Sequence, residues 1–266
     1  MSRIAALARA NWIMFASYRL QLVMSIGALI VTVVPLYFVA GALQPVMGPA
    51  IRDEARTAFG FILIGLATLS LISTAVTTLP SQVGAGIRTG TLEALLATPA
   101  SLPALLVGLV AFDLEWAAIR TVIFVGAGWL LGAQLVGAKL LPAAAILLLL
   151  VAVHFAFGLC AAALVVAFRT AGSIPKAVLF VSGLLGGVYY PTHVIPSWLQ
   201  SASALLPLTY GLRALRRVLL QGQSLAAVGA DVGILALFGV MLTLVGAVAL
   251  TAALRYARLQ GTLAQY

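Results

Sequence analysis

Residues 140–157 read LLPAAAILLLLVAVHFAF. Apolar side chains follow one another here without the alternation of polar and apolar residues that is typical of a membrane-spanning barrel strand. The apolar run continues to residue 168, and a helix of about 20 residues is enough to cross the bilayer core. Because only helices and closed barrels satisfy their backbone hydrogen bonds in lipid, we predict a helical span over residues 141–168.

The composition of the whole chain agrees with this prediction. Of the 266 residues, 63% are hydrophobic and 8% are charged, and the mean hydropathy is +1.16. A soluble domain carries roughly a quarter charged residues, so we expect a single all-α membrane domain over residues 1–266. The net charge of +9 comes from basic residues scattered at the ends of apolar runs, where they anchor helices at lipid headgroups. It does not indicate a nucleic-acid partner.

Five other apolar runs approach the same length. The six predicted spans are 20–43, 58–79, 112–136, 141–168, 174–190 and 226–252. The amphipathic segment 1–19 precedes them and predicts a helix that lies in the headgroup plane. Nine basic residues then fall on one side of the membrane and six on the other. Because cytoplasmic loops carry the excess of Lys and Arg, we place both termini in the cytoplasm.

Three ionisable residues lie at the start of the third predicted span. Asp113 and Glu115 are expected at the inner interface, and Arg120, further along the helix, can extend its charged end to the same level. The alternative is a polar cluster that acts in coupling or in the passage of a substrate, because ionisable groups within a membrane are often functional. The two histidines and the single Cys160 show no ligand spacing, so no metal site is predicted.

The loop between the second and third predicted spans contains a short helix. Thr91 is a good N-cap residue, Glu93 lies in the first turn where the helix dipole favours an acid, and Pro99 marks the end. One side of this helix carries Leu92, Leu95 and Leu96. So short a helix is not stable alone. Its leucines are therefore expected either to rest on the membrane surface or to fit a groove in a cytoplasmic protein.

Two segments together resemble one family of membrane proteins. GTLEALLATP, which begins at Gly90, is similar to the GTLE-x-LL-x-TP segment of ABC-2 type permeases, such as daunorubicin-resistance and nodulation-factor exporter permeases. Further along, Ile195-Pro196 is followed by ten residues and then by Pro207-Leu208-Thr209-Tyr210 and Arg216, which is similar to a second pattern of that family. Ser182 departs from it, because a bulky apolar residue is usual there.

The resemblance implies the membrane subunit of an ATP-driven exporter. In that family the short cytoplasmic helix couples the spans to a separate ABC ATPase, and a re-entrant hairpin, here residues 191–222, closes the outer end. The resemblance assigns coupling to Thr91, Leu92, Glu93, Leu95 and Leu96, and the outer gate to Pro191, Pro196, Trp198, Pro207 and Tyr210. It also implies two ATPase copies, a second permease copy, the bacterial cytoplasmic membrane, and a drug, lipid or lipid-linked glycan as outward cargo.

The chain itself is not expected to be an enzyme. It contains no G-x-x-x-x-G-K-[ST] phosphate loop, so no cofactor is expected in this chain, and ATP and Mg²⁺ belong to the partner subunit. The three arginines Arg213, Arg216 and Arg217 either bind outer-leaflet phosphates or attract an anionic cargo as it leaves. A secondary transporter that needs no ATPase is the alternative function. An intramembrane serine protease and an anchoring protein without transport are further alternatives.

Overall fold

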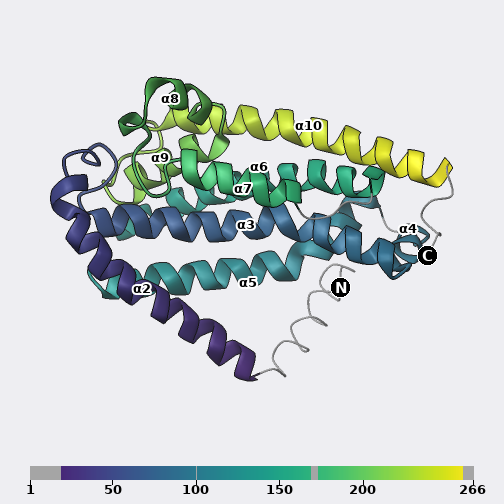
Figure 1. Cartoon of the computed structure of the whole chain (residues 1–266), viewed down its shortest axis with the longest axis horizontal. Coiled ribbons are helices and arrows are strands. Elements are labelled where there is room, and N and C mark those ends of the chain that lie inside the picture. The colour runs from purple at the N-terminus through teal and green to yellow at the C-terminus, as the bar shows by residue number, and fades with distance from the viewer. Residues whose placement is uncertain (1–18, 100, 169–172, 260–266) are drawn as a thin grey trace.

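The computed structural model describes residues 19–99, 101–168 and 173–259, which are helical with no β-strand in these ranges (Figure 1). The helices are α2 (Arg19–Met47), α3 (Ala58–Arg88), α4 (Thr91–Leu96), α5 (Leu102–Leu130), α6 (Leu140–Phe168), α7 (Ser173–Leu185), α8 (Ser197–Ser203), α9 (Pro207–Leu219) and α10 (Gly229–Leu259), with short 3₁₀ turns η1 (Gly137–Lys139) and η2 (Thr192–Val194). The predicted interfacial helix 1–19 lies outside the described residues, apart from Arg19.

The long helices lie side by side and give the bundle two distinct ends (Figure 1). One end carries the short helix α4 and the last turns of α3, α6 and α10, and we call it the α4 end. The other carries α8, α9 and the loop between α2 and α3, and we call it the α9 end. Helix α2 leans away from the other helices towards its first residues, whereas α6 packs along both α3 and α10.

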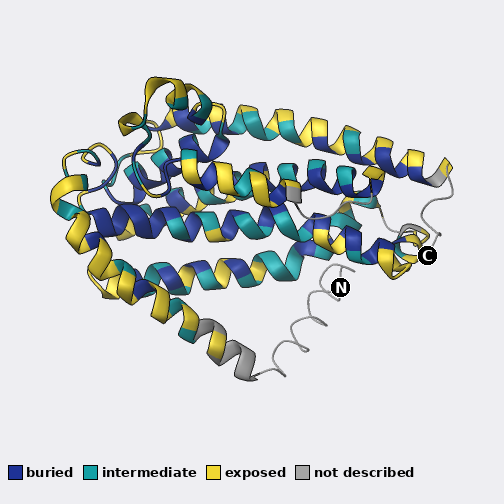
Figure 2. Ribbon diagram, viewed as in Figure 1, coloured by how far each residue is buried: buried dark blue, intermediate teal, exposed yellow. Residues whose placement is uncertain are grey.

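Helix α3 is the centre of the bundle. Twenty of its 31 residues are buried, whereas α2, α5, α6 and α10 bury one face and expose the other (Figure 2). The exposed faces carry large apolar side chains, among them Phe38, Val122, Leu148, Leu244 and Val248. A soluble protein rarely exposes so much contiguous apolar surface, so these faces are suited to lipid.

Five of the described helices are long and apolar enough to cross a membrane, namely α2, α3, α5, α6 and α10. They confirm the predicted all-α membrane fold. The remaining prediction, a span over 174–190, corresponds to α7, which ends at Leu185 after 13 residues. At 1.5 Å per residue α7 is about 20 Å long, which is short of a bilayer core of about 30 Å. The count of six spans is therefore not confirmed.

Two helices extend well beyond the predicted spans in the segment between the second and third spans. Helix α3 does not end before Pro80 but continues to Arg88. Helix α5 begins at Leu102 and not near residue 112. The predicted loop 80–103 is therefore mostly helical, and the charged residues expected at the start of the third span lie more than three turns inside α5.

The packing of α6 explains how α3 continues through Pro80. Proline has no N–H, so the carbonyl of Val76 loses its usual donor four residues on. Gly158 of α6 lies against this part of α3. A Cβ atom added to Gly158 would be 2.8 Å from the carbonyl oxygen of Ala75 and 3.3 Å from that of Val76. The backbone of Gly158 therefore packs directly over the turn of α3 that lacks a hydrogen bond at Pro80.

A substitution of Gly158 tests this contact. We expect Gly158→Ala to destabilise the protein by about 1–3 kcal/mol, because the added methyl group forces two packed backbones apart. Gly126→Ala is the matched control within α5, since a Cβ there meets nothing within 4 Å and alanine favours a helix. The thermal unfolding midpoint in detergent should fall for the first variant and stay equal or rise for the second. Equal midpoints for both variants would contradict the proposed contact.

Candidate functional site

The short helix α4 is held against the bundle by its leucines. Gly90 precedes it with a φ of 70°, a left-handed conformation that favours glycine, and this turn folds α4 back onto α3. Leu92 is buried, and its Cβ lies 3.1 Å from the position that a Cβ on Gly86 of α3 would occupy. Leu95 is half-buried and faces Leu92, Val83 and Leu254 across a narrow apolar gap.

For Leu92, both expected environments, the membrane surface and a groove in a cytoplasmic protein, therefore need correction. Leu92 belongs to the apolar core at the α4 end and is not accessible to a partner. The side chain of Leu96 lies outside the described part of the structure. The exposed residues of α4 are Thr91, Glu93 and Ala94. They form the surface that α4 presents away from the spans.

Thr91 is the first residue of α4 and not its cap. The capping position belongs to Gly90, which has no side chain to donate or accept. The hydroxyl of Thr91 instead lies 2.8 Å from that of Thr89, which in turn donates to the Ala85 carbonyl. The hydroxyl pair links the start of α4 to the last turn of α3.

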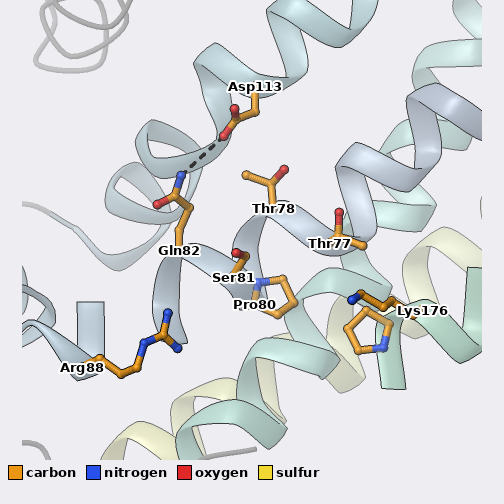
Figure 3. A pocket seen from close by; sticks show the side chains of 9 residues that line it. Thr77, Thr78, Pro80, Ser81, Gln82, Arg88, Asp113 and Lys176 are labelled. Atoms are coloured by element: carbon orange, nitrogen blue, oxygen red, sulfur yellow. Dashed lines mark hydrogen bonds between the residues drawn. The ribbon is translucent and has the colours of Figure 1, made fainter. Parts of the chain in front are cut away.

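A polar cavity of about 540 Å³ opens between α3, α5 and α7 at the α4 end (Figure 3). Its described lining consists of Thr77, Thr78, Pro80, Ser81, Gln82 and Arg88 from α3, Asp113 from α5, and Pro175 and Lys176 from α7. Figure 3 shows Arg88, Asp113 and Lys176 on three different sides of the cavity. Hydroxyl, amide and charged groups thus converge between helices that are otherwise apolar.

Of the predicted polar cluster, only Asp113 faces this cavity. Its Oδ2 atom lies 3.5 Å from Nε2 of Gln82. Glu115 is exposed, and within the described residues no ion pair joins Asp113, Glu115 and Arg120 to one another. Asp113 was predicted at the start of the third span, and in the structure it lies 11 residues after the first residue of α5.

An apolar groove of about 290 Å³ continues along α3 and α7 towards the α9 end. It is lined by Leu69, Ser73, Leu179, Phe180, Gly183, Leu184 and Tyr189. The groove and the polar cavity share the same two helices. We call this shared line of contact the α3–α7 seam. It is polar at the α4 end and apolar towards the α9 end.

Residues 191–222 fold into η2, α8 and α9 at the α9 end. Pro207 begins α9, the hydroxyl of Thr209 donates to the Ser203 carbonyl at 2.8 Å, and that of Tyr210 donates to the Ala204 carbonyl at 2.9 Å. The Pro-Leu-x-Tyr pattern therefore ties α9 to the end of α8. Of the other predicted gate residues, Pro191 is buried, whereas Pro196 and Trp198 are exposed.

Arg216 of α9 is buried among four segments of the chain. Its side chain is 1% exposed. Nη1 donates to Oε2 of Glu54 at 3.1 Å and to the Gly187 carbonyl at 2.8 Å. Nη2 donates to the Val188 carbonyl at 3.0 Å, and Nε donates to the Phe61 carbonyl at 3.1 Å. One guanidinium thus joins the α2–α3 loop, α3, the turn after α7 and α9.

Aromatic contact and close backbone packing complete this arrangement. The guanidinium carbon lies 3.4 Å from the centre of the Phe61 ring, a favourable cation–π position. A Cβ on Gly65 would be 2.4 Å from the Val188 carbonyl oxygen and 2.7 Å from Nη2 of Arg216, so only glycine fits there. Burial lowers the pKa of Arg216 to about 10, and the attraction of Glu54 opposes this shift. The guanidinium therefore remains charged at neutral pH.

The other two arginines of α9 share one acid. Arg213 donates through Nε to Oδ2 of Asp231 at 3.0 Å, and Nη1 of Arg217 lies 4.0 Å from the same oxygen. The hydrogen bond with Asp231 raises the pKa of Arg213. Both arginines are about one-third exposed, whereas Asp231 is buried. In this structure Arg213 and Arg217 can reach a headgroup or a cargo, and Arg216 faces neither.

Sequence reasoning missed Glu54 and Asp231 as partners of these arginines. The chain contains only six acidic residues, so each acid near an apolar segment is a candidate partner for a basic residue. Asp231 was the sole acid in the last predicted span. Glu54 lies 162 positions from Arg216, and no local spacing indicates that pairing.

Removal of the Arg216 side chain tests its structural role. We expect Arg216→Met to lower the free energy of unfolding by about 3–5 kcal/mol, because the substitution leaves the Glu54 carboxylate without its partner. Arg217→Gln is the control and should cost less than about 1 kcal/mol, since its ion pair is long and partly exposed. The measurement is the unfolding midpoint in detergent. Adding Glu54→Gln to Arg216→Met should restore part of the lost stability. If Arg216→Met and Arg217→Gln lower the midpoint equally, the structural role of the buried pair is contradicted.

One comparison identifies the family. The sequence model described as ABC-2 type transporter matches residues 2–220, a region that includes α4, the α3–α7 seam and the Arg216 contacts. No curated protein shows a significant match to the chain. Because the matched region covers most of the 266 residues, the chain belongs to the ABC-2 type transporter family, as a membrane permease.

Proposed function

We propose that this permease is the membrane subunit of an ATP-driven exporter that moves an amphipathic molecule outward across the bacterial cytoplasmic membrane. The α4 end faces the cytoplasm in this proposal, as the distribution of Lys and Arg along the sequence predicts. ATP and Mg²⁺ bind to a separate ABC ATPase, because the sequence has no phosphate loop. Two ATPase copies and a second copy of the permease complete the transporter.

The observation that carries the proposal is the continuity of α3. This helix ends at Arg88, two residues separate it from the start of α4 at Thr91, and Leu92 packs α4 against it. Its other end provides Phe61 and Gly65, which contact Arg216. A displacement of α4 is therefore transmitted along one continuous helix to the contacts that hold α7 and α9.

The two sides of α4 have separate roles in this mechanism. The exposed residues Thr91, Glu93 and Ala94 bind the ATPase, and the buried Leu92 with the half-buried Leu95 transmits the motion to α3. A helix of six residues is not stable alone, so the leucine contacts are required for the docking surface to exist. ATP-driven closure of the ATPase dimer then moves α4 and α3 together.

A secondary transporter remains the alternative function. Asp113 lies within α5 beside a polar cavity, and carboxylates between membrane helices are typical of ion-coupled transport. In that case the chain alone would transport its cargo down an ion gradient and would need no ATPase.

The docking surface is tested by a charge placed on its exposed side. We expect Ala94→Arg to weaken co-purification with the cognate ABC ATPase by on the order of tenfold, which corresponds to about 1.4 kcal/mol, because it adds an unpaired charge to the interface. Ala204→Arg is the matched control, an exposed alanine at the α9 end. Both variants should elute as folded protein in size-exclusion chromatography.

The same experiment separates the two functions. If the unaltered permease retains the ATPase and Ala94→Arg alone releases it, the exporter assignment is supported. If the unaltered permease binds no ATPase, that assignment fails, and uptake driven by an ion gradient in vesicles that contain only this chain is the next measurement.

A further inference from the structure

We propose that the α3–α7 seam binds a single amphiphile with an anionic head group. The head group occupies the polar cavity at the α4 end, and the hydrocarbon chain lies in the apolar groove that follows it. This inference rests on the proposed function and specifies its cargo class. Its test uses the permease without an ATPase, so the two proposals can fail independently.

The polar cavity and the apolar groove follow one another along one face of each helix. On α3, Ser73, Thr77 and Ser81 follow one another at intervals of four residues, which places them on the same side. Ser73 lines the apolar groove, whereas Thr77 and Ser81 line the polar cavity. The hydroxyl of Thr77 donates to the Ser73 carbonyl at 2.8 Å, so the two compartments adjoin within one turn of α3.

Helix α7 shows the same change along its length. Lys176 lines the polar cavity, and Phe180, Gly183 and Leu184 line the apolar groove. Because these residues are separated by three or four positions, they lie on one face of the helix. Lys176 and Leu184 are about 12 Å apart along the axis, which is close to the thickness of one leaflet of a bilayer core of about 30 Å. The seam therefore fits a molecule oriented like a lipid in one leaflet.

The charges of the cavity favour an anionic head group. Arg88 and Lys176 are exposed side chains, and within the described residues no ion pair involves either of them. Among the described lining residues Asp113 is the single acid, and the amide of Gln82 lies beside its carboxylate. Two cations and three hydroxyl groups, those of Thr77, Thr78 and Ser81, can surround a phosphate or carboxylate. A cationic head group would find one carboxylate among the described lining residues, which is a weaker attraction than two cations offer to an anion.

The width of the seam depends on a glycine. A Cβ on Gly183 of α7 would lie 3.2 Å from a methyl group of Leu69 on α3, so the two helices approach closely there. Ser73 is only partly buried, and its small side chain leaves room in the groove. A large apolar side chain at position 73 would occupy the volume that the proposal assigns to the hydrocarbon chain.

Binding to the purified permease in detergent tests the head-group preference. The probes are phosphatidylglycerol and phosphatidylcholine with identical long chains, measured by native mass spectrometry. We expect phosphatidylglycerol to bind at least tenfold more tightly. Arg88→Gln combined with Lys176→Gln should remove this preference, whereas Arg255→Gln combined with Lys139→Gln, which removes the same charge outside the seam, should retain it. Asp113→Asn should strengthen phosphatidylglycerol binding.

A second pair of probes tests the hydrocarbon chain and the source of the anion. Glycerol phosphate alone should not displace long-chain phosphatidylglycerol. Ser73→Phe should weaken the binding of the long-chain lipid and leave the binding of a dihexanoyl analogue unchanged. Displacement by glycerol phosphate would overturn the lipid-like occupant and indicate a free phosphate site.

Two other outcomes would overturn the anionic assignment. Binding of a cationic amphiphile that is lost in Asp113→Asn and strengthened in the double variant of Arg88 and Lys176 would assign the cavity to a cation. An equal loss of preference in the seam variant and in the Arg255 and Lys139 control would show that lipid binds only through the general charge of the surface. In both cases association with the ATPase would still report on the exporter assignment.

Discussion

A charged guanidinium buried at the α9 end determines how the rest of this bundle is assembled. Removing an arginine from water is unfavourable unless nearly every donor finds an acceptor, and Arg216 of α9 meets this requirement with acceptors from three other segments. Two of its acceptors, the carbonyls of Gly187 and Val188, lie in the turn that follows α7. The arginine therefore holds this turn against α3 and α9. If α7 moved without α9, these bonds would be lost together.

The position of α7 in turn creates the α3–α7 seam. Helix α7 is too short to span the bilayer, so it depends on its neighbours for both depth and orientation. Its C-terminal end is held by Arg216, and its first turns carry Pro175 and Lys176 to the wall of the polar cavity. A single short helix thus lies between the wall of the charged cavity and the turn that is held by the buried ion pair.

Helix α3 provides a second connection between the same two ends. It is buried along most of its length, and it contacts α4 through Gly86 and Arg216 through Phe61 and Gly65. Close approach at these glycines lets backbone meet backbone, which is how membrane helices associate when hydrophobic driving force is absent. In the proposed transport cycle, α3 carries the motion of α4, and α7 responds at the seam.

The amino-acid pattern was sufficient for the features that depend on local chemistry. Apolar length predicted the long helices, and the GTLE and Pro-Leu-x-Tyr segments indicated the family, the short helix α4 and the break before α9. Features that depend on contacts between distant segments required the folded chain. The second span was predicted to end at residue 79, but α3 continues through Pro80 to Arg88, and Gly158 of α6 packs against it there. Leu92 was expected to face the membrane surface or a partner protein, but it packs into the core of its own chain. Glu54 and Arg216 are 162 positions apart, and such a pair is specified only when packing places both side chains in the same water-free space, where neither charge is stable alone.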